Sequence, residues 1–216
     1  MSSTSVGYEW GVTFTGIPVA ALDFYDDLEQ DNTKQFWDAN KQTYLDSVQQ
    51  PMRHLIDQLA PEFGEAKLFR PNRDVRYAKN KAPYKTHQGA FVATGPSTGW
   101  YVQVDAAGVM VGAGWYHADS EHLAALRAHI DGDGSRLRRL LASLERAGWS
   151  VHGDRVRTTP RGWSADHPFI ELLRYKDLHV ARRYDNDPLV STAAFADQVA
   201  RDWRASRPLL TWAEAA

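Results

Sequence analysis

The strongest constraint on the fold is a stretch in which the side chains alternate, turn and alternate again. Residues 100–105 alternate between apolar and polar or ring-bearing side chains, residues 106–108 supply a turn, and residues 109–116 return. This pattern predicts an antiparallel hairpin. Gly112 and Gly114 fall on one face of its second strand, which indicates that another group approaches that face closely.

Shorter patterns on both sides of the hairpin predict the remaining elements. Further strands are expected at residues 66–70, 75–77, 89–94, 149–157 and 178–184. Helical periodicity predicts helices at residues 17–30, 34–60, 119–130, 135–144, 168–175 and 189–212. The stripe of residues 34–60 continues across Pro51, which predicts two collinear helices or one kinked helix.

The connections between the central strands decide the fold class. They are too short for crossover helices, so the strands should pair with their neighbours in an antiparallel manner. The expected class is therefore α+β, with a mainly antiparallel sheet of about five to six strands, helices packed against it, and helices near both the N-terminal and C-terminal ends.

Length and composition restrict the class of protein. A chain of 216 residues without cysteine should form one compact domain, here residues 13–216, after a disordered lead-in at residues 1–12. That lead-in lacks the basic region and apolar run of a signal peptide, and no apolar run is long enough for a membrane span. The lack of cysteine excludes disulfides and thiolate chemistry and favours a cytoplasmic location.

Charge is segregated along the chain although the net charge is only −2. Residues 20–65 hold ten acidic and three basic side chains, whereas residues 66–87 hold seven basic side chains and one acidic side chain. The basic stretch forms either a local anion site or a solvated face that pairs with the acidic helices. Pro83, Tyr84 and Thr86 favour a shaped pocket, because they add a rigid turn and hydroxyl donors.

Two residues of this stretch are weak catalytic candidates. Asp74 lies among several bases and should stay ionised, so that orienting Arg73 or Arg76 is favoured over a catalytic role. Lys85 should lower the pKa of His87, which would leave a neutral imidazole near pH 7 as a general base or, as we favour, as a binding group.

A second group of basic residues, late in the chain, could lie close in space to the basic stretch of residues 66–87. Trp115 and Tyr116 would then supply rings for stacking, and the group consists of Arg161, Arg174, Lys176, Arg182 and Arg183. The predicted ligand-binding residues are Arg70, Arg73, Arg76, Lys81, Tyr84, Lys85, His87, Trp115, Arg161 and Lys176.

The basic stretch also carries a resemblance. Residues 70–89, RPNRDVRYAKNKAPYKTHQG, are similar to the signature of a bacterial conserved-hypothetical family, domain of unknown function 2461. Residues 31–37 resemble that family's entry to its second helix, and residues 112–115 resemble its glycine-rich strand. Tyr77 stands where the family usually has Phe, and Asn80 where it usually has Asp. The resemblance implies where a site lies and leaves its chemistry open.

We therefore expect a basic pocket over residues 70–87 that binds a phosphate- or carboxylate-bearing small molecule, either as an enzyme or as a binding protein. The competing hypotheses are a nucleic-acid-binding module, in which Trp115, Tyr116 or Trp163 stacks on bases, and a protein-interaction module that docks an acidic partner. The sequence contains no P-loop, dinucleotide-binding or nucleophile-elbow motif, and its histidine spacing suits no metal site. Neither a cofactor nor a membrane partner is expected, and the sequence does not determine the oligomeric state.

Overall fold

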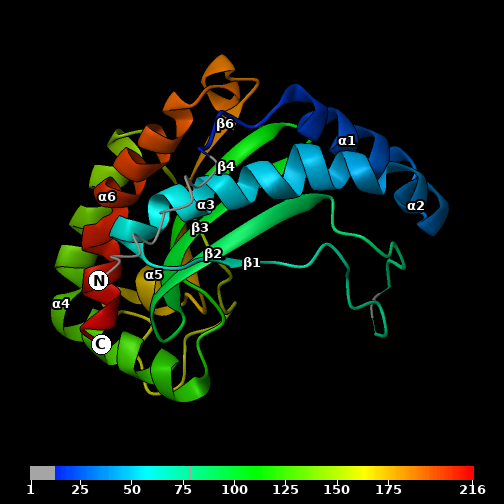
Figure 1. Ribbon diagram of the computed structural model, residues 1–216. Coiled ribbons are helices and arrows are strands. Elements are labelled where there is room, and N and C mark those ends of the chain that lie inside the picture. The colour runs from blue at the N-terminus through cyan, green and yellow to red at the C-terminus, as the bar shows by residue number, and fades with distance from the viewer. Residues whose placement is uncertain (1–12, 78) are drawn as a thin grey trace, which may run out of the picture.

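One antiparallel sheet organises the chain. The computed structural model describes residues 13–77 and 79–216, so the expected lead-in at residues 1–12 lies outside the described residues. The strand order is β1–β2–β3–β4–β6–β5 (Figure 1). The strands are β1 (Lys67–Leu68), β2 (His87–Gly95), β3 (Thr98–Asp105), β4 (Gly108–Trp115), β5 (Ser150–His152) and β6 (Leu178–Asp185). The antiparallel sheet and the predicted hairpin, which is β3–β4, are confirmed.

Helices precede the sheet, follow it and connect its strands, as the α+β class requires. They are α1 (Val19–Gln30), α2 (Lys34–Thr43), α3 (Gln50–Phe63), α4 (Ser120–Arg146), the single turn α5 (Ile170–Leu173) and α6 (Ala194–Glu214). A 3₁₀ turn covers Pro188–Ser191. Within the described residues, no helix is both long enough and apolar enough to cross a membrane.

Pro51 is accommodated by a change of helix type. Between α2 and α3 the backbone forms a π-helical turn at Tyr44–Gln49, so helical structure continues from residue 34 to residue 63. Proline cannot donate the usual helical hydrogen bond, and its ring displaces a carbonyl of the preceding turn. The wider turn absorbs that displacement, so the helical structure continues across Pro51 as the sequence predicts.

Two local predictions need correction. Residues 75–77 form no strand, because no neighbouring strand offers them hydrogen bonds. The strand expected at residues 149–157 shortens to β5. The two helices expected at residues 119–130 and 135–144 are confirmed as the two parts of α4, which meet at a kink where the backbone of Asp133 leaves the helical region.

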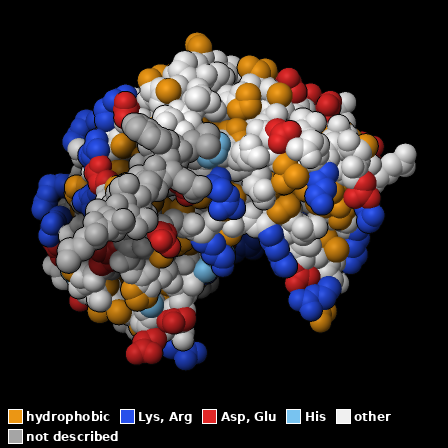
Figure 2. Space-filling model, viewed as in Figure 1, with side chains coloured by type: hydrophobic (Ala, Val, Ile, Leu, Met, Phe, Trp, Pro, Cys, Tyr) orange, Lys and Arg blue, Asp and Glu red, His pale blue; other side chains and the backbone are white. Residues whose placement is uncertain are grey.

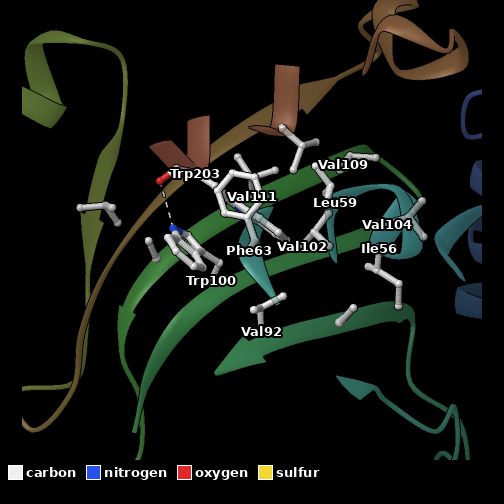
Figure 3. Packing of buried hydrophobic residues seen from close by; sticks show 14 of the residues in the cluster. Ile56, Leu59, Phe63, Val92, Trp100, Val102, Val104, Val109, Val111 and Trp203 are labelled. Atoms are coloured by element: carbon white, nitrogen blue, oxygen red, sulfur yellow. Dashed lines mark hydrogen bonds between the residues drawn. The ribbon is translucent and has the colours of Figure 1, made fainter. Parts of the chain in front are cut away.

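The helices pack on one face of the sheet. The core-facing side chains of β3 are Trp100, Val102 and Val104, all at most 2 % exposed, and α1, α3 and α6 contact the central strands. Figure 3 shows Trp100 beside Phe63 and Trp203, and the three rings contact one another. The Trp100 indole nitrogen donates a hydrogen bond to the carbonyl oxygen of Trp203 at 3.0 Å. The alternation read from the sequence therefore identifies the core face.

The other face of the sheet carries half-buried polar and aromatic side chains. Tyr101, Gln103 and Asp105 alternate with the core residues of β3 and point away from them. Gly112 lies opposite Tyr101 on β4. We call this surface, formed by the side chains of the sheet that point away from the helices, the open face.

A buried carboxylate fixes α6 against the edge of the sheet. Asp202 is 2 % exposed and accepts a hydrogen bond from Arg182 at 2.7 Å and another from the Tyr184 hydroxyl. Both donors come from β6. Because burial of an unpaired charge is costly, these bonds tie the helix to one position on the strand.

We predict that Asp202→Ala lowers the free energy of unfolding by about 2–3 kcal/mol, because it leaves the Arg182 guanidinium partly buried without its partner. Urea denaturation measures the difference. The matched control is Asp197→Ala on the exposed side of α6, which should change stability by less than about 0.5 kcal/mol. Equal effects of the two substitutions would show that the buried contact does not hold the helix.

Candidate functional site

The basic stretch forms a loop that projects beside the sheet. We call residues 69–86, which connect β1 to β2, the basic arm (Figure 1). Its base is closed by two backbone hydrogen bonds of 2.8 Å, from Arg73 N to the Pro83 carbonyl and from Lys85 N to the Pro71 carbonyl. The two sides of the loop are thereby held at a fixed separation, which positions the side chains of Arg73 and Lys85.

A second set of contacts anchors the arm to the helices. The Asn32 side chain accepts a hydrogen bond from Tyr84 N and donates one to the Tyr84 carbonyl, both at 3.1 Å. The Tyr84 ring stacks on Trp37 with a centroid separation of 4.1 Å and an interplanar angle of 9°. Tyr84 is only 7 % exposed, so the residue predicted to bind ligand is chiefly an anchor of the arm.

A cavity of about 600 Å³ lies between the arm and the end of α1. Its lining residues are Glu29, Asn32, Arg73, Asn80, Ala82, Tyr84, Lys85, Thr86 and His87. Four of the predicted binding residues therefore meet at one cavity. In Figure 2 the molecule is hollowed beside the arm, and Lys and Arg side chains gather around the hollow.

The two cations of this cavity have no anionic partner. In the part of the chain that the structure describes, neither Arg73 nor Lys85 forms an ion pair, and no carboxylate of α1–α3 pairs with a base of the arm. Burial lowers the pKa of Lys85 below its usual range, and the nearby Arg70 adds to the effect. The solvated-face hypothesis, in which the basic stretch pairs with acidic helices, therefore has no support from these contacts.

His87 occupies the junction of this cavity with a second one. Burial lowers the pKa of His87 below its ordinary value, and the positive charge of Lys85 lowers it further. The lowered pKa favours the neutral imidazole, which can accept a proton or donate a hydrogen bond. Asp105 is the register partner of His87 across β2 and β3 and partly opposes the depression of its pKa.

The second cavity has a volume of about 290 Å³ and extends over the open face. It adds Asp105 and Arg183 to the lining, and Arg183 donates hydrogen bonds to both carboxylate oxygens of Asp105 at 2.8 and 3.1 Å. Burial alone would raise the pKa of Asp105, but the hydrogen bonds from Arg183 and Gln103 outweigh it and lower the pKa. Asp105 is thus an ionised, paired carboxylate and an orienting group for the neighbourhood of His87.

Other predicted residues of the arm lie outside the cavity lining. Arg70, Arg76 and Lys81 are exposed, and the Lys81 ammonium donates a hydrogen bond to the Val75 carbonyl at 3.0 Å. Asp74 forms an ion pair with Arg76 at 2.6 Å, and the hydrogen bond from that guanidinium lowers the pKa of the Asp74 carboxyl. This ion pair lies on the surface of the arm, and the orienting role that the sequence favours for Asp74 stays a prediction.

Three predicted residues from later in the chain are not brought to the cavity. Trp115 is 1 % exposed and packs against Trp212 on the helix-covered face, so it is not available for stacking on a ligand. Arg161 lies in an exposed turn. Lys176 is exposed, and its nearest carboxylate is Asp154 at 3.8 Å. Of the second basic group, Arg161 and Lys176 therefore lie away from the cavity, whereas Arg183 lines the neighbouring cavity that includes His87.

Glu29, Asn32 and Asp105 line the cavities but were not identified as site residues from the sequence. Asp105 had a usable signal, since it continues the polar side of the alternation in β3. The sequence placed Arg183 in the second basic group, and the pairing of β4 with β6, which connects residues about 70 positions apart, brings it to the second cavity.

The comparisons with known proteins agree with the sequence resemblance. The family model for conserved hypothetical proteins (DUF2461) matches residues 20–212. No curated protein matches the chain. The chain belongs to the DUF2461 family, and the matched range includes the arm, its anchor on α1–α2 and the whole sheet.

We predict that Asn32→Ala loosens the arm and leaves the sheet intact. Loss of two side-chain hydrogen bonds should lower stability by about 1–2 kcal/mol, and trypsin should cut the arm faster because the arm is rich in Lys and Arg. Limited proteolysis with mass analysis of the fragments measures this. Asn40→Ala, which removes a single bond within α2, is the control, and equal cleavage rates in the two variants would contradict the anchoring role.

We predict that His87→Gln changes how stability depends on pH. A histidine whose folded pKa is depressed binds more protons in the unfolded state, so its presence costs stability as pH falls below about 6.5. The wild type should lose stability relative to His87→Gln between pH 7.5 and pH 5.5. Thermal unfolding at both pH values measures this difference, and a pH-independent difference would show that His87 titrates normally.

Proposed function

We propose that this protein binds a small molecule bearing a phosphate or carboxylate group in the cavity of the basic arm. The observation that carries the proposal is the pair of partly buried cations without partners, Arg73 and Lys85, on one cavity wall. Removing a cation from water costs free energy, and a nearby opposite charge offsets that cost. An anionic ligand supplies that charge.

The cavity offers different contacts to different parts of such a ligand. Arg73 can hold two oxygens of a phosphate or carboxylate with its planar fork, whereas Lys85 contributes a point charge. The Thr86 hydroxyl adds a neutral donor or acceptor. Glu29, which lines the cavity from the end of α1, could accept a hydrogen bond from a hydroxyl or amino group of the ligand and would repel a second anionic group. The combination favours a ligand with one anionic end and one hydrogen-bond-donating end.

A role in proton transfer is compatible with the same arrangement. His87 lies at the edge of the cavity, where its lowered pKa favours the neutral imidazole, and an anion bound beside it would raise its affinity for a proton. A ligand held by Arg73 and Lys85 would place its polar groups beside this imidazole. The proposal concerns binding first, and His87 is the residue of the cavity suited to act as a general base.

One observation favours nucleic acid as an alternative partner. Tyr77 is 96 % exposed near the end of the arm and follows Arg76 in the chain. An exposed ring among basic side chains is the arrangement with which single-stranded nucleic acid is bound by stacking and phosphate contacts. Binding of that kind weakens steeply as salt is added.

We predict that Arg73→Ala and Lys85→Ala each weaken anion binding about tenfold or more, because each removes a charged hydrogen bond of the cavity. Calorimetric titration with methyl phosphate and with acetate provides the measurement, and unfolding curves establish that the variants remain folded.

The controls separate the cavity from the general charge of the arm. Lys79→Ala and Arg76→Ala remove one positive charge each from exposed positions of the same arm, and both should bind the probes as the wild type does. If they weaken binding as much as the cavity variants, the arm acts through its overall field. If neither probe binds the wild type at millimolar concentration, the proposed anion site is wrong.

A further inference from the structure

The open face carries a row of aromatic rings beside the cavity of the basic arm that Arg73 and Lys85 line. We call that cavity, the proposed anion site, the anion cavity. Phe91, Tyr101 and Tyr116 extend from β2, from β3 and from the end of β4. The Phe91 and Tyr116 rings meet edge to face with their centroids 5.6 Å apart, and Phe69 packs against Tyr101 at 6.4 Å. The described residues place no helix over these rings, since the helices pack on the other face.

Glycines on neighbouring strands let these rings lie low on the sheet. A Cβ at Gly89 would collide with the Tyr101 hydroxyl, and a Cβ at Gly99 would lie 2.6 Å from the Phe91 ring. Any larger residue at these positions would push the rings up from the backbone. The rings therefore cover the sheet without filling the space above it, which keeps a cavity open.

That space is a separate cavity of about 330 Å³, which we call the aromatic cradle. Its lining residues are Phe69, Phe91, Ser97, Tyr101, Tyr116 and His117. The volume is at the lower end of the range for small-molecule sites. Four of the six lining side chains carry a phenyl or phenol ring. A flat ring can stack against such a lining with dispersion and edge-to-face contacts.

Phe69 and Lys85 join the cradle to the anion cavity. The Phe69 ring lines the cradle, and the Lys85 ammonium, which lines the anion cavity, lies 5.3 Å from the centroid of that ring. A second cation, Lys67, lies 6.0 Å from the same centroid. A molecule with an aromatic part and an anionic part could therefore occupy both spaces at once, with the lysines at the point where the two parts meet.

We infer that the ligand of this protein carries a planar aromatic or heteroaromatic ring, which stacks in the aromatic cradle while its phosphate or carboxylate group binds Arg73 and Lys85. The ligand class is that of aryl phosphates, aryl carboxylates and nucleoside monophosphates. This inference rests on the proposed anion site and names the rest of the molecule that the site recognises. The positive charge at the border of the cradle favours this occupant over a neutral apolar one.

The test compares probes that differ only in the ring. Calorimetric titration of the wild type with phenyl phosphate and methyl phosphate, and with adenosine 5′-monophosphate and ribose 5-phosphate, gives two affinity ratios. A stacked ring should make the ring-bearing probe of at least one pair about tenfold tighter or more. Phe69→Leu and Tyr101→Leu should reduce that ratio to about threefold or less, because leucine keeps apolar volume and loses the flat ring.

Control variants and an NMR measurement distinguish loss of the stacked ring from a general disturbance of folding. Tyr77→Leu makes the same chemical change at an exposed position of the arm and should leave the ratio unchanged. Arg73→Ala should weaken both members of a pair equally and so preserve the ratio. In the wild type, NMR signals of the Phe69 and Tyr101 rings should shift with phenyl phosphate and not with methyl phosphate.

The outcomes distinguish the two proposals. If methyl phosphate binds and neither ring-bearing probe binds more tightly than its partner, the cradle inference is overturned and the anion site stands. If no probe binds, both fall. A thymidine oligonucleotide that binds far more tightly than the mononucleotide, with a steep loss in salt, would overturn the small-molecule class. Self-association that Phe69→Leu abolishes, without ring-dependent probe binding, would assign the cradle to contacts between copies of the chain.

Discussion

The packing of α1, α3 and α6 on one face of the sheet is the constraint from which the rest of the structure follows. The β2–β3 and β3–β4 connections are tight hairpins, so no helix can pass to the other face between the central strands. The N-terminal helices and α6 bury the same row of valine and tryptophan side chains. The open face therefore carries half-buried polar and aromatic side chains. Side chains of this face line both the anion cavity and the aromatic cradle.

The arm depends on the helices in a different way. It has almost no sheet pairing of its own, with one isolated bridge between Asn72 and Tyr84. Its position is instead set by Asn32 and Trp37, which contact Tyr84 from the beginning of the chain. Residues 31–37 therefore anchor the loop that residues 70–89 form.

The sequence predicted the parts of the fold that local physics determines. Alternation in residues 100–116 identified the hairpin and placed Trp115 on the same face as Val109 and Val111, which the structure shows to be the core. That pattern was sufficient to predict burial of Trp115, yet the binding hypothesis assigned it to a ligand. Composition alone could not distinguish a ring in the core from a ring on a surface.

The rest of the candidate site could not be predicted because it depends on register. Arg183 and Asp105 meet only because β4 pairs with both β3 and β6 in one particular alignment. Glu29 reaches the cavity because α1 ends beside the arm. The strand predicted at residues 75–77 is absent for a related reason. Residues with high β propensity form a strand only where a neighbouring strand supplies hydrogen-bond partners.

The distribution of ion pairs is the reason for which we propose an anion at this cavity. Several cations elsewhere have carboxylate partners: Arg182 has Asp202, Arg183 has Asp105, and Arg204 has Glu62. Arg73 and Lys85 are half-buried and line the same cavity, and among the described residues neither forms an ion pair. An anion that entered the cavity would offset the cost of removing these two charges from water.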